Sequence, residues 1–301
     1  MKKYDLHIHS KFSDGDYSVE EIVSKVRLCG IDIFSITDHD NIESIKAMEN
    51  VDKRGLVYIP GVEISCEKND YKMHILGYNI DVNNTELVQL LQNMKMRKNL
   101  RNLEIIQQLK EKFGIIISKD ETEKLLTAKN FVGQTTIARL LTKGGIIPNT
   151  QYAFDHYFKY MDLKTPATAP LEQAINTIHL AGGYAVLAHP ISLERTYGVN
   201  IEDIFGMFKN AGIDGIEIFN SKHTLSDIKR YLKLAKRENI LISGGSDFHG
   251  EIMKSNVKLG GLLKDGTEKE HHYKMTILSK CIEKNRIKDV YDGDEIEIWK
   301  I

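Results

Sequence analysis

Histidines and acidic residues stand at the ends of short apolar segments in this chain. Asp247 and His249 lie two positions apart in GSDFHG, directly after the apolar run ILI. His7 and His9 lie two apart in DLHIHS, and alternate residues of a strand project to one face. Such pairs can bind a metal ion or transfer protons, provided that the fold supplies partners for them.

Five more residues of these two chemical types lie in or just after other predicted strands and in one acidic loop. They are Asp14 in SDG, His39 in TDHD, Glu63 in GVEIS, His74 in MHILGY and His189 in LAHP. A single strand histidine is commonly a hydrogen-bonded core ring, so no member decides the question alone. As a set, these partly buried groups would repel one another when protonated and lose hydration unless a shared cation organised them.

The types of these side chains indicate which metal would bind. Imidazole and carboxylate without thiolate suit Zn²⁺, Mn²⁺ or Fe²⁺. The candidates exceed what one ion takes, so we expect two or three divalent ions with a carboxylate bridging them. Cys29, Cys66 and Cys281 show no CxxC spacing and are expected to be reduced thiols.

Other histidines and acidic residues have ordinary structural explanations. Asp38 and Asp40 flank His39 and are expected to cap the helix that follows. The histidines without a partner pattern are His156, His179, His271 and His272.

Predicted strands and helices alternate toward both ends of the chain. Strands are predicted at 4–9 and 31–37 and in LVYIPGVEIS and KMHILGY, and Ser18–Glu21 has capping-box spacing. Further strands alternate with helices predicted at 170–181, 201–211 and 225–238. The pattern predicts an α/β fold, a parallel barrel (1–80 and 165–301) with an inserted helical subdomain (81–164). The carboxyl ends of barrel strands converge on one rim, which would gather the candidate ligands.

Composition argues against a nucleic-acid or membrane surface. The net charge is −1, with 42% hydrophobic and 28% charged residues, so no basic field favours duplex nucleic acid. The N-terminus turns polar within a few residues, and no apolar run approaches the roughly 18 residues of a membrane span. We expect a cytoplasmic protein that acts on a small molecule.

In chain order, DLHIHSKFSDG, ITDHD, GVEIS, HILGY, LAHP and GGSDFHG resemble the polymerase and histidinol phosphatase (PHP) family of metal-dependent phosphoesterases. The resemblance spans about residues 3–80 and 165–262. It implies a distorted (β/α)7 barrel with a trinuclear metal centre. It also implies that His7, His9, Glu63 and Asp247 hold one ion, that Glu63 bridges to a second held by His74 and His189, and that Asp14, His39 and His249 hold the third.

The activity implied by the resemblance is hydrolysis of a phosphate monoester. Such a dianion repels hydroxide, and a hydroxide that bridges metal ions would attack it while the ions neutralise the phosphoryl oxygens. Glu63 and Asp247 would act as ligands at the reacting centre. His223 in NSKHT aligns with a family histidine near the leaving group, which implies phosphate binding or general-acid catalysis.

Within the family, the layout is similar to the branch that hydrolyses nucleoside 3′,5′-bisphosphates and short oligonucleotides from the 5′ end. That branch usually has Arg-x-His before ARxL and Gly-Arg after AHP. This chain has Gln134 and Thr136 at the first place, and Arg195 is displaced at the second. These residues and His223 are candidate substrate contacts, and loss of a bidentate phosphate clamp leaves the nucleotide specificity open.

Two other functions are compatible with clustered histidines at a barrel rim. One is C–N hydrolysis of the amidohydrolase kind, although no lysine in these motifs looks placed to bridge metals. The other is a non-catalytic, metal-binding regulatory module, although such relics usually lose ligands. The insert is expected either to cover the rim as a lid or to serve as a stabilising or dimerising appendage.

Overall fold

The strands of the chain form two sheets. The computed structural model describes residues 3–128, 133–251, 256–261, 276–277 and 280–281. A parallel three-stranded sheet contains β1 (Tyr4–Ile8), β2 (Ile33–Ile36) and β3 (Val57–Tyr58). A mixed six-stranded sheet has the order β6 (Ala169–Pro170), β4 (Gly61–Lys68), β5 (Tyr71–Tyr78), β7 (Tyr184–Leu187), β8 (Gly215–Asn220) and β9 (Leu241–Gly245). The predicted α/β class is confirmed.

One strand departs from the predicted parallel arrangement. β5 runs antiparallel to both β4 and β7, so the prediction of an all-parallel barrel is wrong at this strand. Only Asn69 and Asp70 join β4 to β5, and their φ angles of 50° and 64° are those of a tight hairpin turn. A parallel connection would need a crossover of about a dozen residues or more.

The two sheets meet at two seams, and the described strands do not form one closed barrel. At the first seam β1 lies beside β9: a bridge pairs Ile8 with Phe248, and the Asp247 N–H donates to the His7 carbonyl at 2.9 Å. At the second seam a bridge pairs His39 with Glu63. Predicted ligands stand at both seams, so the meeting of the sheets brings them together.

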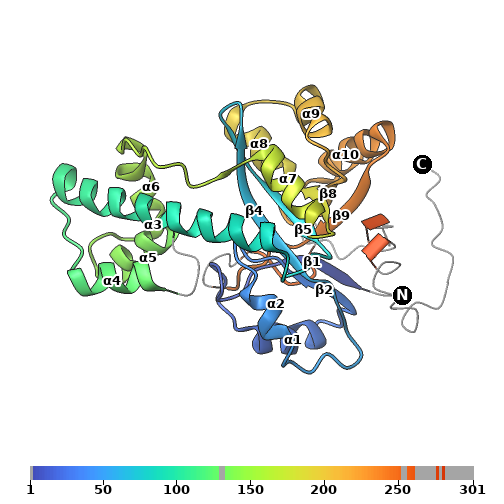
Figure 1. The fold of residues 1–301 in the computed structure, drawn as a ribbon, viewed down its shortest axis with the longest axis horizontal. Coiled ribbons are helices and arrows are strands. Elements are labelled where there is room, and N and C mark those ends of the chain that lie inside the picture. The colour runs from blue at the N-terminus through green and yellow to red at the C-terminus, as the bar shows by residue number, and fades with distance from the viewer. Residues whose placement is uncertain (1–2, 129–132, 252–255, 262–275, 278–279, 282–301) are drawn as a thin grey trace.

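Helices cover both sheets (Figure 1). α1 (Val19–Leu28) and α2 (Glu43–Met48) pack on the small sheet. The predicted capping box of α1 is present, because Ser18 and Glu21 each accept a hydrogen bond from the backbone N–H of the other. The large sheet is covered by α7 (Leu171–Leu180), α8 (Pro190–Tyr197), α9 (Ile201–Asn210) and α10 (Leu225–Glu238). Of these, α8 is the helix that the sequence pattern does not predict.

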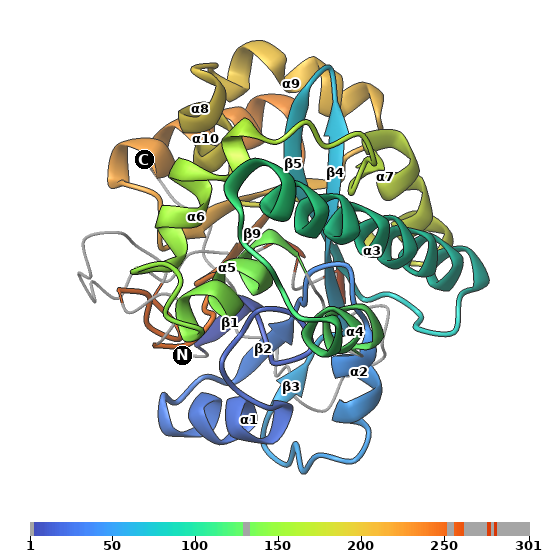
Figure 2. The same ribbon diagram turned by 90° about the vertical axis from the view of Figure 1, so that its left-hand side faces the viewer.

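The predicted insert is helical and has an apolar cluster of its own (Figure 2). It contains α3 (Thr85–Phe113), α4 (Lys119–Thr127), α5 (Gln134–Lys143), α6 (Thr150–His156) and the short 3-10 helix η1 (Phe158–Tyr160). Leu87 and Met94, in the first half of α3, pack instead in the main core. α3 therefore joins both clusters, and the division of the chain at 81 and 164 stays a prediction.

The residues expected to have structural roles lie outside the ligand cluster where they are described. His156 stacks on Tyr152, and His179 lies 2.7 Å from Asp214. His271 and His272, in the tail that the sequence leaves without an assignment, fall outside the described residues. The three cysteines are free thiols. Among the described helices, none combines the length and the apolar character needed to cross a membrane.

Gly245 tests the first seam because it lies against β1. A Cβ at this position would stand 2.3 Å from both the Cβ and the backbone nitrogen of His7. We expect Gly245→Ala to lower the free energy of unfolding by about 1–3 kcal/mol, since the backbone must shift. Gly206→Ala in α9 is the control: its Cβ meets nothing within 4 Å, and it should raise stability by about 0.5–1 kcal/mol. Denaturant unfolding measures both, and a Gly245→Ala protein of unchanged stability would contradict the β1–β9 packing.

Candidate metal centre

The nine predicted ligands converge where the two sheets meet. Three groups of side chains among the described residues could each hold a metal ion, since the ligand atoms of each group lie within 4.8 Å of one another. The groups are His9, Asp14, His39 and His249; His7, Glu63, His189 and Asp247; and His39, Glu63 and His74. Each of the nine belongs to at least one group.

Glu63 lies between the groups and is fully buried. Its two oxygens divide five imidazole rings between them. Oε1 lies 3.0 Å from His74 Nδ1 and from His189 Nε2, whereas Oε2 lies 3.0 Å from His39 Nδ1, 3.1 Å from His9 Nε2 and 3.3 Å from His7 Nε2. A carboxylate that faces different rings with each oxygen has the geometry of a bridging ligand.

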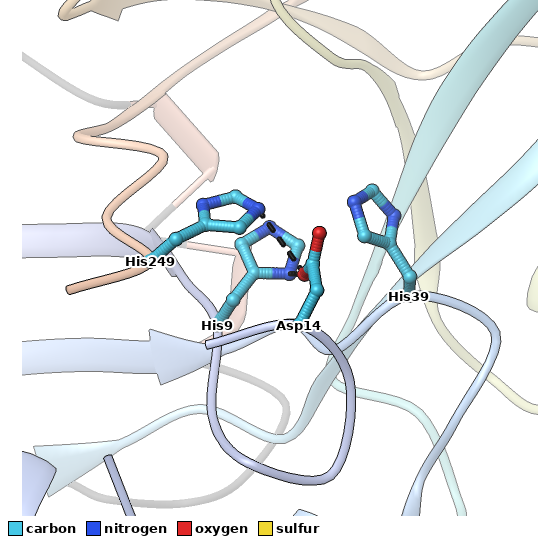
Figure 3. Close-up of side chains that lie close together, drawn as sticks. All are labelled: His9, Asp14, His39 and His249. Carbon is cyan, nitrogen blue, oxygen red and sulfur yellow. Dashed lines mark ion pairs between the residues drawn. The ribbon is translucent and has the colours of Figure 1, made fainter. Parts of the chain in front are cut away.

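The group around Asp14 is assembled from separate segments (Figure 3). Asp14 Oδ1 lies 3.2 Å from His249 Nε2 and 3.7 Å from His9 Nδ1, and His39 faces it from the other side. The His9 and His249 rings stack with their centroids 3.9 Å apart. Two cationic rings would repel at this distance, so the arrangement favours neutral rings that share a cation.

Asp247 and His189 are held in unusual backbone conformations. Their φ angles are 59° and 25°, in the left-handed region that residues other than glycine rarely adopt. Asp247 Oδ1 lies 3.5 Å from His7 Nε2 and 3.4 Å from His9 Nε2, and Oδ2 lies 2.7 Å from the ammonium of Lys222. Backbone strain of this kind concentrates at functional sites, and here it aims both side chains into the cluster.

The three groups differ in part from the division of ligands that the resemblance implies. His9 directs Nε2 toward Glu63 and Asp247, as implied, but its Nδ1 faces Asp14 and places it in that group. His39 belongs to two groups. The assignment of each ligand to an ion stays a prediction.

A buried carboxylate that the sequence analysis does not identify orients the His7 ring and binds the backbone N–H of His189. Glu217 on β8 lies 2.9 Å from His7 Nδ1, and it accepts a hydrogen bond from the His189 N–H at 2.7 Å. With Nδ1 of His7 bound to Glu217, its Nε2 faces Glu63. Outer carboxylates orient metal-binding histidines in this way. An ionisable residue within the apolar strand IEIF is the sequence signal that indicates it.

Asp38 and Asp40 hold loops together and do not cap α2, which corrects the prediction. α2 begins after Ile42 without a side-chain hydrogen bond. Asp38 accepts hydrogen bonds from the Ser10 N–H and hydroxyl, both at 2.7 Å, and Asp40 accepts from the Ser65 N–H and hydroxyl at 2.7 and 2.8 Å. These bonds fix the backbone on either side of His39 to Ser10, just after β1, and to Ser65 in β4.

Burial and neighbouring charges shift the pKa values of the cluster in different directions. Burial opposes the charged form of His9, but hydrogen bonds to Asp247 and Glu63 raise its pKa to about 9. Burial and the charge of Lys222 lower the pKa of His189 to about 4. Burial raises the pKa of Glu63, but the surrounding imidazoles outweigh it and hold that pKa well below its ordinary value. Metal binding requires neutral His9, so it should release a proton.

Several buried polar atoms in the cluster have no hydrogen-bond partner among the described residues. They are Nε2 of His7 and of His9, Nδ1 of His74, Oδ1 of Asp14 and Oε2 of Glu63. Buried polar atoms are normally satisfied, and exceptions require an explanation such as an ion. Because these atoms point toward one another and are the donor types that divalent transition metals prefer, the residues fit a metal centre.

The other predicted site residues lie outside the three groups. His223 is fully buried, and its Nδ1 lies 2.7 Å from the Ile218 carbonyl. Arg195 is exposed and donates to the Lys222 carbonyl at 3.2 Å. Gln134 and Thr136 lie in the first turn of α5, where the Thr136 hydroxyl accepts from the Gly133 N–H at 3.4 Å.

Lys222 is a cation at the cluster that the sequence analysis does not identify. It belongs to the motif NSKHT, and its ammonium contacts Asp247 directly, so a lysine does lie at the cluster. An ammonium has no lone pair and cannot itself ligate a metal. Lys222 directly precedes His223, a predicted site residue, and this position is the sequence signal that could have identified the lysine.

The insert contacts the loops that carry two of the ligands. Lys98 of α3 is buried and forms an ion pair with Asp40, next to His39. Arg139 of α5 donates to the Asp14 carbonyl at 3.2 Å and lies 3.7 Å from the Asp16 carboxylate. α3 and α5 of the insert therefore contact the loops that carry His39 and Asp14, and Figure 2 shows these helices in front of the strands.

Comparison with known proteins matches this arrangement to one family. The PHP domain model matches residues 5–184. The chain is 36% identical over 252 residues to the 5′-3′ exoribonuclease of Haemophilus influenzae, covering 82% of this chain and 90% of that protein. It is 30% identical over 257 residues to the 3′,5′-nucleoside bisphosphate phosphatase of Chromobacterium violaceum, covering 83% and 88%.

A solved structure described as an amidohydrolase from Chromobacterium violaceum, with bound sulfate and no metal, is also similar. It superimposes with a TM-score of 0.71 at 28% identity, covering 82% of this chain and 87% of that one.

Metal content tests the cluster directly. Protein purified without chelator should contain about two to three equivalents of transition metal by elemental analysis. Glu63→Gln should lower metal affinity by about 10–100-fold or more, because the amide removes the charge on which five rings converge. Glu67→Gln, on the same strand but outside the three groups, should retain the metal. Full metal content in Glu63→Gln would contradict the central position of this carboxylate.

Proposed function

The chain belongs to the PHP domain family, and we propose that it hydrolyses a phosphate ester of a nucleoside bisphosphate or a short oligonucleotide. It is a metal-dependent hydrolase of phosphoric esters, as its family and relatives indicate. The convergence of six imidazoles on Glu63, Asp14 and Asp247 supports the proposal most strongly. We infer that the two sheets are the halves of a distorted (β/α)7 barrel joined at the seams.

The nine clustered side chains would hold two or three Mn²⁺, Fe²⁺ or Zn²⁺ ions, with Glu63 as the bridging ligand. Bound there, the ions would supply an activated water and neutralise the phosphoryl charge. The chain's own residues keep the ligands in place: Glu217 orients His7, and Asp38 and Asp40 hold the loops beside His39. Such fixed positions avoid reorganisation during the reaction.

His223 is proposed to contact the substrate. The Ile218 carbonyl can only accept, so Nδ1 of His223 carries the proton, and in the neutral ring Nε2 is an acceptor. Burial lowers the pKa of His223, which favours that neutral ring. We therefore infer that His223 accepts a hydrogen bond from the substrate, whereas phosphate binding or general-acid catalysis would require the cationic ring.

The insert is proposed to act as a lid that reads the substrate beyond its scissile phosphate. Lys98 and Arg139 hold it to the loops of His39 and Asp14. Gln134 and Thr136 stand in the helix of Arg139, at its N-terminal end. Arg195 donates a hydrogen bond to the Lys222 carbonyl. We propose that it is the cationic substrate contact in place of the Gly-Arg that follows AHP in related proteins.

C–N hydrolysis remains the second candidate, because the solved structure from Chromobacterium violaceum is described as an amidohydrolase. A screen for phosphate release with Mn²⁺, over p-nitrophenyl phosphate and a panel of phosphorylated metabolites, separates the two. We expect hydrolysis of p-nitrophenyl phosphate and faster turnover of nucleoside bisphosphates, since these offer a second phosphate. Cleavage of amides without phosphate release from any ester would overturn the proposal.

The lid predicts a gain of function. Gln134→Arg with Thr136→His should improve kcat/KM for nucleoside bisphosphates by up to about 1–3 kcal/mol of charge-assisted hydrogen bonding. Hydrolysis of p-nitrophenyl phosphate should hardly change, because this small ester does not extend to the lid. Gln151→Arg, which adds a charge to exposed α6 of the same insert, is the control. An equal effect on both substrates, or no effect on either, would show that this segment does not contact the substrate.

A further inference from the structure

Lys222 places a cation at the edge of the metal cluster. It lies two residues after the end of β8, and its Nζ lies 2.7 Å from Asp247 Oδ2. The Asp247 side chain is 2% exposed, whereas the Lys222 side chain is 30% exposed. The pair therefore has a buried carboxylate on the cluster side and an ammonium that reaches solvent.

The two oxygens of Asp247 face different partners. Oδ1 is directed at His7, His9 and His249, at 3.4–3.5 Å, and Oδ2 is directed at Lys222. Metal ions held by the rings beside Oδ1 would attract a phosphate to this side of Asp247. Because Oδ1 and Oδ2 belong to one carboxylate, the phosphate would then lie near the ammonium of Lys222. An ammonium has three donors, so it can keep Asp247 and still donate to a phosphoryl oxygen.

The backbone of Lys222 is fixed to the network that orients the ligands. Its N–H donates to Asn220 Oδ1 at 3.0 Å, and its carbonyl accepts from Arg195 at 3.2 Å. Asn220 in turn donates to Glu217, which binds His7. Only the flexible stem of the lysine is free to adjust to a ligand.

We propose that Lys222 is a substrate-binding residue whose ammonium contacts the scissile phosphate beside Asp247. This inference rests on the proposed phosphoesterase function and adds a contact that supplies positive charge where neutral His223 does not. In the alternative, Lys222 serves only as the counter-charge of buried Asp247. If Lys222 binds substrate, removal of its ammonium should lower the affinity for phosphate. If it is only a counter-charge, removal should lower metal retention and stability.

Lys222→Met and Lys222→Arg separate these roles in the metal-loaded protein. We expect Lys222→Met to keep its metal content and thermal midpoint, while the Kd for inorganic phosphate, measured by calorimetry, and the KM for p-nitrophenyl phosphate rise at least about tenfold. Lys222→Arg should restore much of the phosphate affinity, because it keeps the charge. Lys229→Met, at an exposed position of α10, should behave as the unchanged protein.

If Lys222→Met loses metal or stability while the remaining loaded protein binds phosphate with unchanged affinity, Lys222 is a structural counter-charge and the inference is wrong. If the unchanged protein hydrolyses no phosphate ester, the proposed function fails instead. Calorimetry with inorganic phosphate still decides the role of Lys222 in that case, because it requires no turnover.

Discussion

The structure depends on six imidazoles, most of them buried, that surround only three carboxylates. Glu63, His7 and His9 are essentially inaccessible to water, and the rings that surround Glu63 and Asp14 cannot all be charged at once or all be satisfied by hydrogen bonds. A shared cation would remove this conflict, because neutral imidazole nitrogens and carboxylates could then all serve as ligands. The left-handed backbone of Asp247 and the hydrogen bonds of Glu217 serve this arrangement.

The two seams show how distant segments reach one centre. At the first, β1 brings His7 and His9 beside Asp247 and His249; at the second, the end of β2 brings His39 beside Glu63. Both seams use only isolated bridges and a few backbone hydrogen bonds, so the sheets are coupled weakly through the backbone and strongly through the side chains between them. Metal binding in the gap should therefore contribute to the stability of the fold as well as to its chemistry.

The sequence predicts the ligands because their types, order and positions after apolar strands are local features. All nine converge, and the capping box of α1 forms as its spacing predicts. The antiparallel direction of β5 could have been predicted from the sequence, since Asn69 and Asp70 are residue types that favour a hairpin turn. The hydrogen-bond partners of Asp38, Asp40 and Glu217 could not be predicted from the sequence, because a buried carboxylate binds whichever donor the tertiary fold brings to it.

Two cationic side chains near the centre hold the insert in place, and two others reach solvent, where they could contact a substrate. Lys98 is buried against Asp40, and Arg139 lies between the Asp14 carbonyl and Asp16. Their charges therefore hold the insert to the ligand loops. Arg195, in α8 after β7, and Lys222, after β8, instead reach solvent, and a hydrogen bond from Arg195 to the Lys222 carbonyl joins them. If Arg195 and Lys222 bind phosphate as we propose, positive charge would contact the substrate at the strand ends, whereas Gln134 and Thr136 of the insert would offer it only uncharged groups.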